Sequence, residues 1–177
     1  MPFFHFHIHK YQRLLLLFQK FLYEHFCQVF EDQNISYNEV RTRPTPFNSI
    51  LWCANVETDS AFYIGTYSLL DKDNDIEFLR YEKNHTALGP LASEDKIKRM
   101  IKISKGWYII RKTEDDKLLF CDLRFGQAGF GQDKPFVFSY VINRDKNDEL
   151  FLKEAPKTFK GGFSMMEELA SRVLGNT

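Results

Sequence analysis

The sequence predicts an α+β fold: a curved antiparallel sheet of about six to eight strands, with an N-terminal helix, one middle helix and a C-terminal helix. Short β-rich runs follow one another through tight polar turns, which is typical of antiparallel hairpins. The helical patterns lie at the two ends and once in the middle, so they do not alternate with every strand. Aromatic residues make up 16% of the 177 residues, which is enough to build a core between sheet and helices.

The first expected element is a helix over about residues 11–32. Apolar residues recur there at spacings of three and four, which is the signature of one buried helix face. This stripe consists of Leu15, Phe18, Leu22, Phe26 and Val29, and it is widened by Leu16, Leu17, Phe21 and Phe30. Asn34 stands where a left-handed C-cap is expected. The helix is too apolar to stand alone in water, so it must pack on the sheet, on a partner or on a membrane surface.

The β-rich runs fill most of the chain after this helix, and polar turns separate them. We expect strands at 36–42, 49–57, 61–70, 76–81, 107–113, 117–125, 136–143 and 150–154. Pro44 and Pro46 end the first strand because proline lacks the backbone donor. Ser93 opens the middle helix and Gly106 closes it. Gly175 is the expected C-cap of the last helix.

These elements predict three segments along the chain. Residues 1–33 form a stem helix, residues 34–155 form the antiparallel α+β domain, and residues 156–177 form a linker and the C-terminal helix.

Composition argues against several function classes. The 24 basic and 24 acidic residues give zero net charge, whereas a nucleic-acid-binding protein normally has a basic excess. Cys27, Cys53 and Cys121 are odd in number and far apart, so we interpret them as small buried thiols and expect neither disulfides nor a zinc site. No signal peptide or membrane-spanning run is evident. We expect no cofactor.

No complete catalytic motif is present. His5, His7 and His9 alternate and would share one face of a strand, but this terminal segment offers no supporting shell for a metal. Serine and cysteine nucleophile motifs and phosphate-binding glycine loops are also missing. The sequence therefore predicts no catalytic residue and no metal ligand.

Two segments are candidates for ligand binding. The first offers two guanidiniums, an amide and a large ring beside a stiff turn, in Arg41, Arg43, Asn48 and Trp52. The second is the strand end with Asp122 and Arg124, which point to the same face because strand side chains alternate. A structural ion pair on a solvated face is an equally good interpretation of the second segment.

These two segments also carry a family resemblance. RPTPFNSILW at 43–52, YIGTYSLLD at 63–71 and DLRFG at 122–126 resemble, in order and spacing, the C-terminal soluble region of a bacterial inner-membrane family. That family is described as membrane-bound metal-dependent hydrolases, and also as LexA-binding, membrane-associated hydrolases. The resemblance covers about residues 34–143.

The resemblance implies a membrane-associated parent protein whose His and Asp metal ligands lie in an N-terminal multi-helix membrane region. No position of this chain matches those ligands, so the hydrolase activity does not transfer to it. The first helix would then leave the last membrane helix. Lys10, Arg13 and Lys20 beside its Leu run predict a cytoplasmic exit. We expect the cytoplasmic face of the inner membrane, or the cytoplasm for a stand-alone protein.

Three hypotheses follow. In the first, the chain is a non-catalytic soluble binding or regulatory domain of such a hydrolase. In the second, it is a small enzyme or ligand-binding protein with an aromatic cavity, which requires an acid or base with a shifted pKa in that cavity and would be favoured by Asp122 or His85 buried in a deep pocket. In the third, it is an interaction domain that forms a homodimer through the first helix. The same helix would contact a membrane region or a membrane partner in the first hypothesis.

Overall fold

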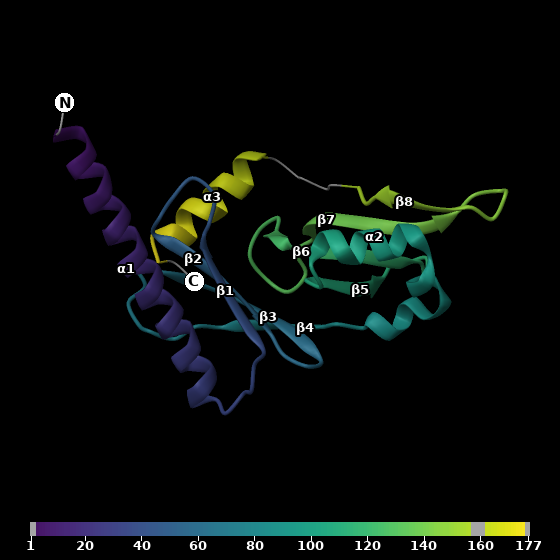
Figure 1. Ribbon diagram of the computed structural model, residues 1–177, viewed down its shortest axis with the longest axis horizontal. Coiled ribbons are helices and arrows are strands. Elements are labelled where there is room, and N and C mark those ends of the chain that lie inside the picture. Colours follow the sequence, from purple (N-terminus) through teal and green to yellow (C-terminus); the bar gives the residue numbers. More distant parts are fainter. Residues whose placement is uncertain (1–2, 157–161, 176–177) are drawn as a thin grey trace. The chain divides into compact units, whose positions relative to one another are not determined.

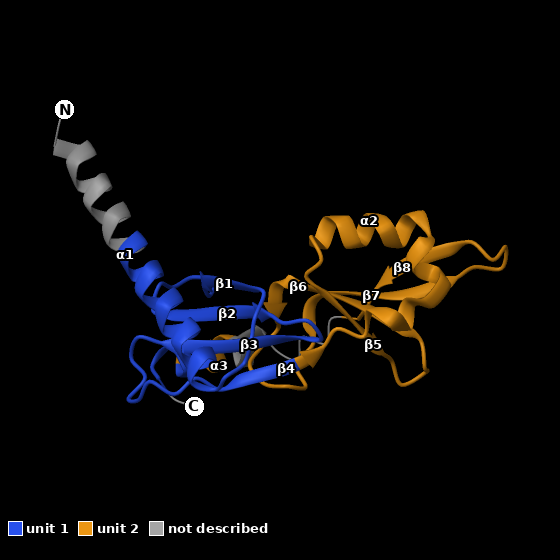
Figure 2. Ribbon diagram, turned by 60° about the horizontal axis from the view of Figure 1, so that its bottom comes forward, with its two compact units in different colours: residues 1–80, 171–177 blue, residues 81–170 orange. Residues whose placement is uncertain are grey.

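The computed structural model describes residues 3–156 and 162–175, and the side chains of residues 16–156 and 166–175. The predicted α+β class is confirmed. Where one curved sheet was expected, the described residues form eight strands in two antiparallel four-stranded sheets, with orders β1-β2-β3-β4 and β5-β6-β7-β8 (Figure 1). The chain divides into two compact units, residues 1–80 with 171–177 (unit 1) and residues 81–170 (unit 2) (Figure 2). The boundary between the units falls inside the segment 34–155.

Unit 1 begins with a long helix that is followed by antiparallel strands. Its elements are α1 (Phe3–Asp32), β1 (Glu39–Pro44), β2 (Leu51–Glu57), β3 (Ala61–Ser68), most of β4 (Phe78–Glu82) and the end of α3 (Gly162–Val173). The helix α1 begins at Phe3 rather than near Tyr11, because residues 3–10 contain no Gly or Pro to break it. The alternating histidines therefore lie on a helix and not on a strand. The side chains of His5, His7 and His9 lie outside the described residues.

The core of unit 1 forms where α1 packs on the sheet. Leu22, Phe26 and Phe30 of α1 are buried together with alternate residues of β2, among them Trp52. The ring of Phe30 makes an edge-to-face contact with Phe78 at 4.4 Å between centroids. Truncating one such buried aromatic side chain typically costs about 3–5 kcal/mol.

The predicted C-cap of α1 is confirmed. Asn34 adopts the left-handed conformation, with a φ of 53°. The backbone N–H of Ile35 donates to the carbonyl of Phe30 at 3.1 Å, which is the six-to-one bond of a Schellman motif.

The end of α3 is fixed to unit 1 by a partly buried ion pair. The Arg172 guanidinium donates to both carboxylate oxygens of Asp71, at 2.6 and 2.8 Å. Burial alone would raise the pKa of Asp71, but hydrogen bonds from Arg172 and from the Ser68 N–H outweigh it and lower the pKa below its ordinary value. The predicted C-cap Gly175 has a φ of 79°.

Unit 2 consists of a helical segment laid on the second sheet. Its elements are the end of β4, the 3₁₀ segment η1 (His85–Ser93), α2 (Asp95–Ser104), β5 (Tyr108–Lys112), β6 (Leu118–Gln127), β7 (Phe136–Arg144), β8 (Leu150–Glu154) and most of α3. The helix α2 starts at Asp95, and the predicted start residue Ser93 instead donates its hydroxyl to the Pro90 carbonyl at 2.7 Å. Gly106 ends α2 as predicted, with a φ of 82°.

The two faces of the sheet β5–β8 differ. Ile97 of α2 packs with Tyr108, Ile110 and Phe120, so α2 covers the face formed by these alternate strand residues. The residues between them, such as Cys121, point to the opposite face.

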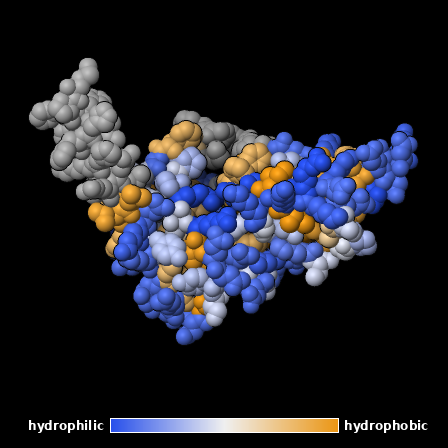
Figure 3. All heavy atoms as spheres, in the orientation of Figure 1, coloured by the Kyte–Doolittle hydropathy of each residue, from blue (hydrophilic) through white to orange (hydrophobic). Residues whose placement is uncertain are grey.

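Hydrophobic residues also reach the surface at the described start of α1, where Figure 3 shows them beside the grey N-terminal residues. No described helix is both long and apolar enough to cross a membrane.

Candidate functional site

The predicted site residues Asn48 and Trp52 are engaged within unit 1. The Asn48 side-chain oxygen accepts the backbone N–H groups of Ile50 and Leu51 at 3.0 and 2.7 Å. Trp52 is 2% exposed, and its indole N–H donates to the Ser49 carbonyl at 2.9 Å. Both side chains therefore shape the turn between β1 and β2.

Arg41 and Arg43 lie on the same face of β1. Arg41 pairs with Glu39, with an Nε to Oε1 distance of 2.6 Å. Arg43 is half-buried opposite Cys53 of β2, and its positive charge opposes the rise in the pKa of Cys53 that burial causes. That these two guanidiniums bind a ligand stays a prediction.

Asp122 and Arg124 form an ion pair within β6 in unit 2. The two side chains share one face of the strand, as the sequence predicted, and an Arg124 terminal nitrogen lies 2.6 Å from Asp122 Oδ2. The Arg124 backbone N–H also donates to the Asp122 carboxylate at 3.0 Å. Hydrogen bonding to Asp122 raises the pKa of Arg124 above its ordinary value. Each charge thus neutralises the other, which matches the structural interpretation of this pair. The structure does not test whether the pair binds a ligand.

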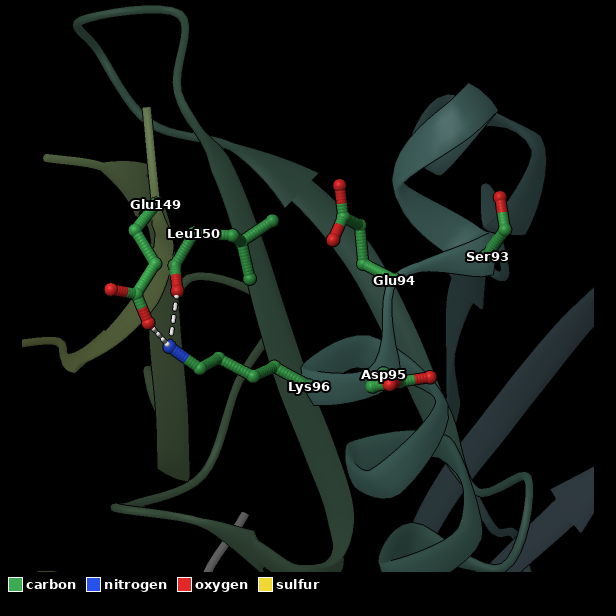
Figure 4. A pocket seen from close by; sticks show the side chains of 6 residues that line it. All are labelled: Ser93, Glu94, Asp95, Lys96, Glu149 and Leu150. Carbon is green, nitrogen blue, oxygen red and sulfur yellow. Dashed lines mark hydrogen bonds and ion pairs between the residues drawn. The ribbon is translucent and has the colours of Figure 1, made fainter. Parts of the chain in front are cut away.

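A shallow hollow lies at the start of α2, and Figure 4 shows its lining residues. Lys96 reaches across it and donates to Glu149 and to the Leu150 carbonyl, at 2.8 and 2.7 Å. Glu94 pairs with Arg144 at 3.1 Å. Because Lys96 and two of the acids are already paired, this hollow offers little to a ligand.

A second pocket, of about 240 Å³, lies on the sheet β5–β8. It is lined by strand residues such as Arg111, Leu119, Cys121 and Ser139, together with the loop before β7. These strand residues belong to the face opposite α2 and opposite the Asp122–Arg124 pair, because side chains alternate along a strand.

Cys121 and Ser139 are register partners on β6 and β7 at the base of this pocket. The Ser139 hydroxyl lies 3.5 Å from Cys121 Sγ and 3.3 Å from the Phe136 carbonyl oxygen. Burial raises the pKa of Cys121 to about 11, although Ser139 and Arg111 act in the opposite direction. The thiol is therefore protonated at neutral pH, and this arrangement does not favour a nucleophilic cysteine.

Arg111 is the charged group that distinguishes the pocket. Its side chain is half-buried, and no hydrogen bond or ion pair joins its guanidinium to another described residue. Lys112 also lines the pocket, but its ammonium is paired with Asp116 at 2.6 Å. Asp133 stands exposed in the lining, beyond ion-pair distance of Arg111. The pocket therefore presents, inside a partly apolar wall, a guanidinium that no described carboxylate pairs with, and the Asp133 carboxylate lies elsewhere in the same lining.

The sequence did not identify Arg111, Cys121, Ser139 or Asp133 as a site. One feature of the sequence could have indicated this site. Arg111 lies two residues after Ile109, so the two side chains share one face of the strand, and Arg111 places a charge on a face that is otherwise apolar. The approach of the loop to that face depends on tertiary folding, and no local pattern encodes it.

The histidine side chains that the structure describes make polar contacts or stack on other rings. His85 Nε2 lies 2.8 Å from the Tyr108 carbonyl oxygen, and its ring stacks on the Tyr108 ring at 3.9 Å. Neither His85 nor Asp122 lines the pockets described above.

Among the described residues, no group of three or more His, Cys, Asp or Glu is arranged to hold a metal ion. The three cysteines are free and buried, which confirms their interpretation as small apolar thiols.

Comparisons with known proteins found no match: no family model, no curated protein and no solved structure is significantly similar to this chain.

Proposed function

We propose that this chain is a non-catalytic binding or regulatory domain, and that it binds a small anion in the pocket of the sheet β5–β8. The observation that carries the proposal is the half-buried Arg111, which has no counter-ion among the described residues. A charge withdrawn from water is costly unless it is paired. An anionic ligand would supply the missing partner.

The chemistry of the lining narrows the ligand class. Guanidinium recognises carboxylate and phosphate oxygens through two parallel hydrogen bonds. Leu119, Val137 and Phe136 provide apolar surface beside Arg111, and the Ser139 hydroxyl adds a polar contact. The volume of about 240 Å³ lies below the range of drug-sized pockets, so it suits a compact molecule. A small carboxylate with an apolar body fits these features best.

The family resemblance gives this proposal its context. In that context, the chain is the C-terminal region of a membrane-associated hydrolase, and its ligand would regulate or position the parent protein. The described residues supply no metal-binding set, so we derive no reaction step through a metal.

Titration calorimetry of the full chain with benzoate, acetate and inorganic phosphate tests the proposal. We expect benzoate to bind more tightly than acetate, because its ring adds apolar contact with Leu119 and Val137. Arg111→Ala should abolish the heat of binding. Arg99→Ala is the matched control, since Arg99 is an exposed arginine on α2 and does not line the pocket.

Equal binding of benzoate by the wild-type chain and the Arg111→Ala variant would contradict the assignment of the site. Failure of all three probes to bind would contradict the anion-binding function itself.

A further inference from the structure

The pocket on the sheet β5–β8 contains a carboxylate as well as a guanidinium. Asp133 belongs to its lining and lies in the loop before β7, whereas Arg111 lies on the strand β5. The two groups do not pair with each other, and neither forms an ion pair with any other residue that the structure describes. The pocket thus offers one binding group of each sign to a single bound molecule.

The neighbouring charged groups are already paired. Lys112 also lines the pocket, and its ammonium lies 2.6 Å from a carboxylate oxygen of Asp116. Lys134 follows Asp133 in the sequence, and it pairs with Glu168 of α3 at 3.1 Å. These pairs leave one guanidinium and one carboxylate of the lining for a ligand to meet.

The loop that carries Asp133 is held on both sides of this residue. The side-chain amide of Gln127 donates to the carbonyls of Gly131 and Lys134, at 3.1 and 2.9 Å. The ion pair between Lys134 and Glu168 provides a second anchor. A loop that is already fixed needs little further ordering when a ligand binds, which favours affinity.

The Tyr81 hydroxyl lies within electrostatic range of both charges. The ring of Tyr81 contacts that of Phe136, a lining residue, with 5.2 Å between centroids. Burial raises the pKa of Tyr81 above its ordinary value, and Gln127 opposes this rise. The charge of Arg111 also lowers this pKa, whereas the charge of Asp133 raises it. The guanidinium and the carboxylate therefore lie around the same part of the pocket.

The lining fits a molecule that has a carboxylate, an ammonium group and an apolar body. Guanidinium binds a carboxylate through two parallel hydrogen bonds, and an ammonium group has three donors that a carboxylate can accept. Leu119 and Val137 supply apolar surface in the same lining. We propose that the pocket binds a small zwitterionic amino acid with an apolar side chain, whose carboxylate meets Arg111 and whose ammonium group meets Asp133. This inference rests on the proposed anion-binding function and specifies its ligand class.

Titration calorimetry of the full chain with leucine and with 4-methylpentanoate tests the ligand class, because the two molecules differ only in the amino group. We expect leucine to bind roughly fivefold more tightly, which is the upper range for an ion pair with one exposed partner. The Arg111→Ala variant should bind neither molecule.

The Asp133→Asn variant should lose the preference for leucine, because an amide does not attract the ammonium group. Its affinity for 4-methylpentanoate should be at least as high as that of the wild-type chain, since a negative charge has left the lining. Asp133 is exposed, so the thermal unfolding midpoint should stay unchanged. Asp115→Asn is the matched control, since Asp115 is an exposed aspartate in the turn between β5 and β6 and does not line the pocket.

The possible results separate this inference from the proposed function. Binding of 4-methylpentanoate that Arg111→Ala abolishes, with leucine bound no more tightly, would overturn the zwitterionic ligand and leave the anion pocket standing. A preference for leucine that persists in Asp133→Asn would overturn the role of Asp133. If neither molecule binds the wild-type chain, the proposed function and this inference both fail.

Discussion

The two faces of the sheet β5–β8 use charged residues in opposite ways. On the face covered by α2, Asp122 and Arg124 neutralise each other over a distance of 2.6 Å. On the other face, Arg111 lines a pocket without a partner among the described residues. A conspicuous charged pair in a sequence can therefore satisfy itself within one strand, whereas the proposed ligand site lies at a single charge on an apolar strand face.

The largest expected effect comes from emptying the core on the α2 face. Phe120 is fully buried and stacks on Tyr108 at 4.6 Å between ring centroids. We expect Phe120→Ala to lower the free energy of unfolding by about 4 kcal/mol, because it leaves a cavity. Chemical denaturation measures this change. A loss below about 1 kcal/mol would show that this face is not the packed side of the sheet.

Breaking the ion pair on the same face should have the next largest effect. Arg124→Met leaves the buried Asp122 carboxylate without its partner, so we expect a loss of about 3 kcal/mol. The double variant Asp122→Asn/Arg124→Met should recover most of this loss, because no uncompensated charge remains. If the stability lost in the double variant equals the sum of the losses in the two single variants, the double-mutant cycle would contradict the assignment of this pair as structural.

The Cys121 thiol should make stability depend on alkaline pH. Because burial raises its pKa to about 11 in the folded chain, the unfolded chain loses this proton first as pH rises. The stabilising contribution is therefore complete below the ordinary thiol pKa of about 8.5 and is lost as pH rises through about 11.

We expect the difference between the wild-type chain and Cys121→Ala to shrink by on the order of 2 kcal/mol across this pH range. Denaturation at a series of pH values measures it, and subtracting the variant removes the contribution of the tyrosines, which titrate in the same range. A constant difference between the two chains would mean that Cys121 is accessible to water.

The smallest stability effect belongs to Arg111 itself. Arg111 has no ion-pair partner among the described residues. Its replacement by an apolar side chain of similar length therefore removes few stabilising interactions. We expect Arg111→Met to change the free energy of unfolding by less than about 1 kcal/mol, in either direction. A larger loss in thermal or chemical denaturation would indicate that Arg111 supports the fold, and would weaken the contrast between the two faces.

Much of the fold could be predicted because it is encoded in local patterns. The periodicity of Leu22, Phe26 and Phe30 identifies α1, and Asn34 and Gly175 adopt the predicted cap conformations. The start of α1 was misplaced, since aromatic and histidine residues neither favour nor forbid a helix. The segment η1 was missed, because Gly89 and Pro90 indicate a turn rather than a helical segment.

The division into two sheets and the candidate pocket could not be predicted in the same way. Both depend on contacts between residues distant in sequence, such as those that bring the loop before β7 toward Cys121. The two predicted segments were chosen for their local chemistry. The structure shows that Asn48, Trp52 and Asp122 have partners nearby in the chain.

The most direct test of this contrast is a nuclear magnetic resonance titration of the isotope-labelled full chain with benzoate. Binding in the pocket should shift the side-chain Nε–H signal of Arg111 and leave the Nε–H signal of Arg124 nearly unchanged, because the two side chains lie on opposite faces of the sheet. Shifts centred on Arg124, with Arg111 unaffected, would contradict the account and return the site to the ion pair on the α2 face.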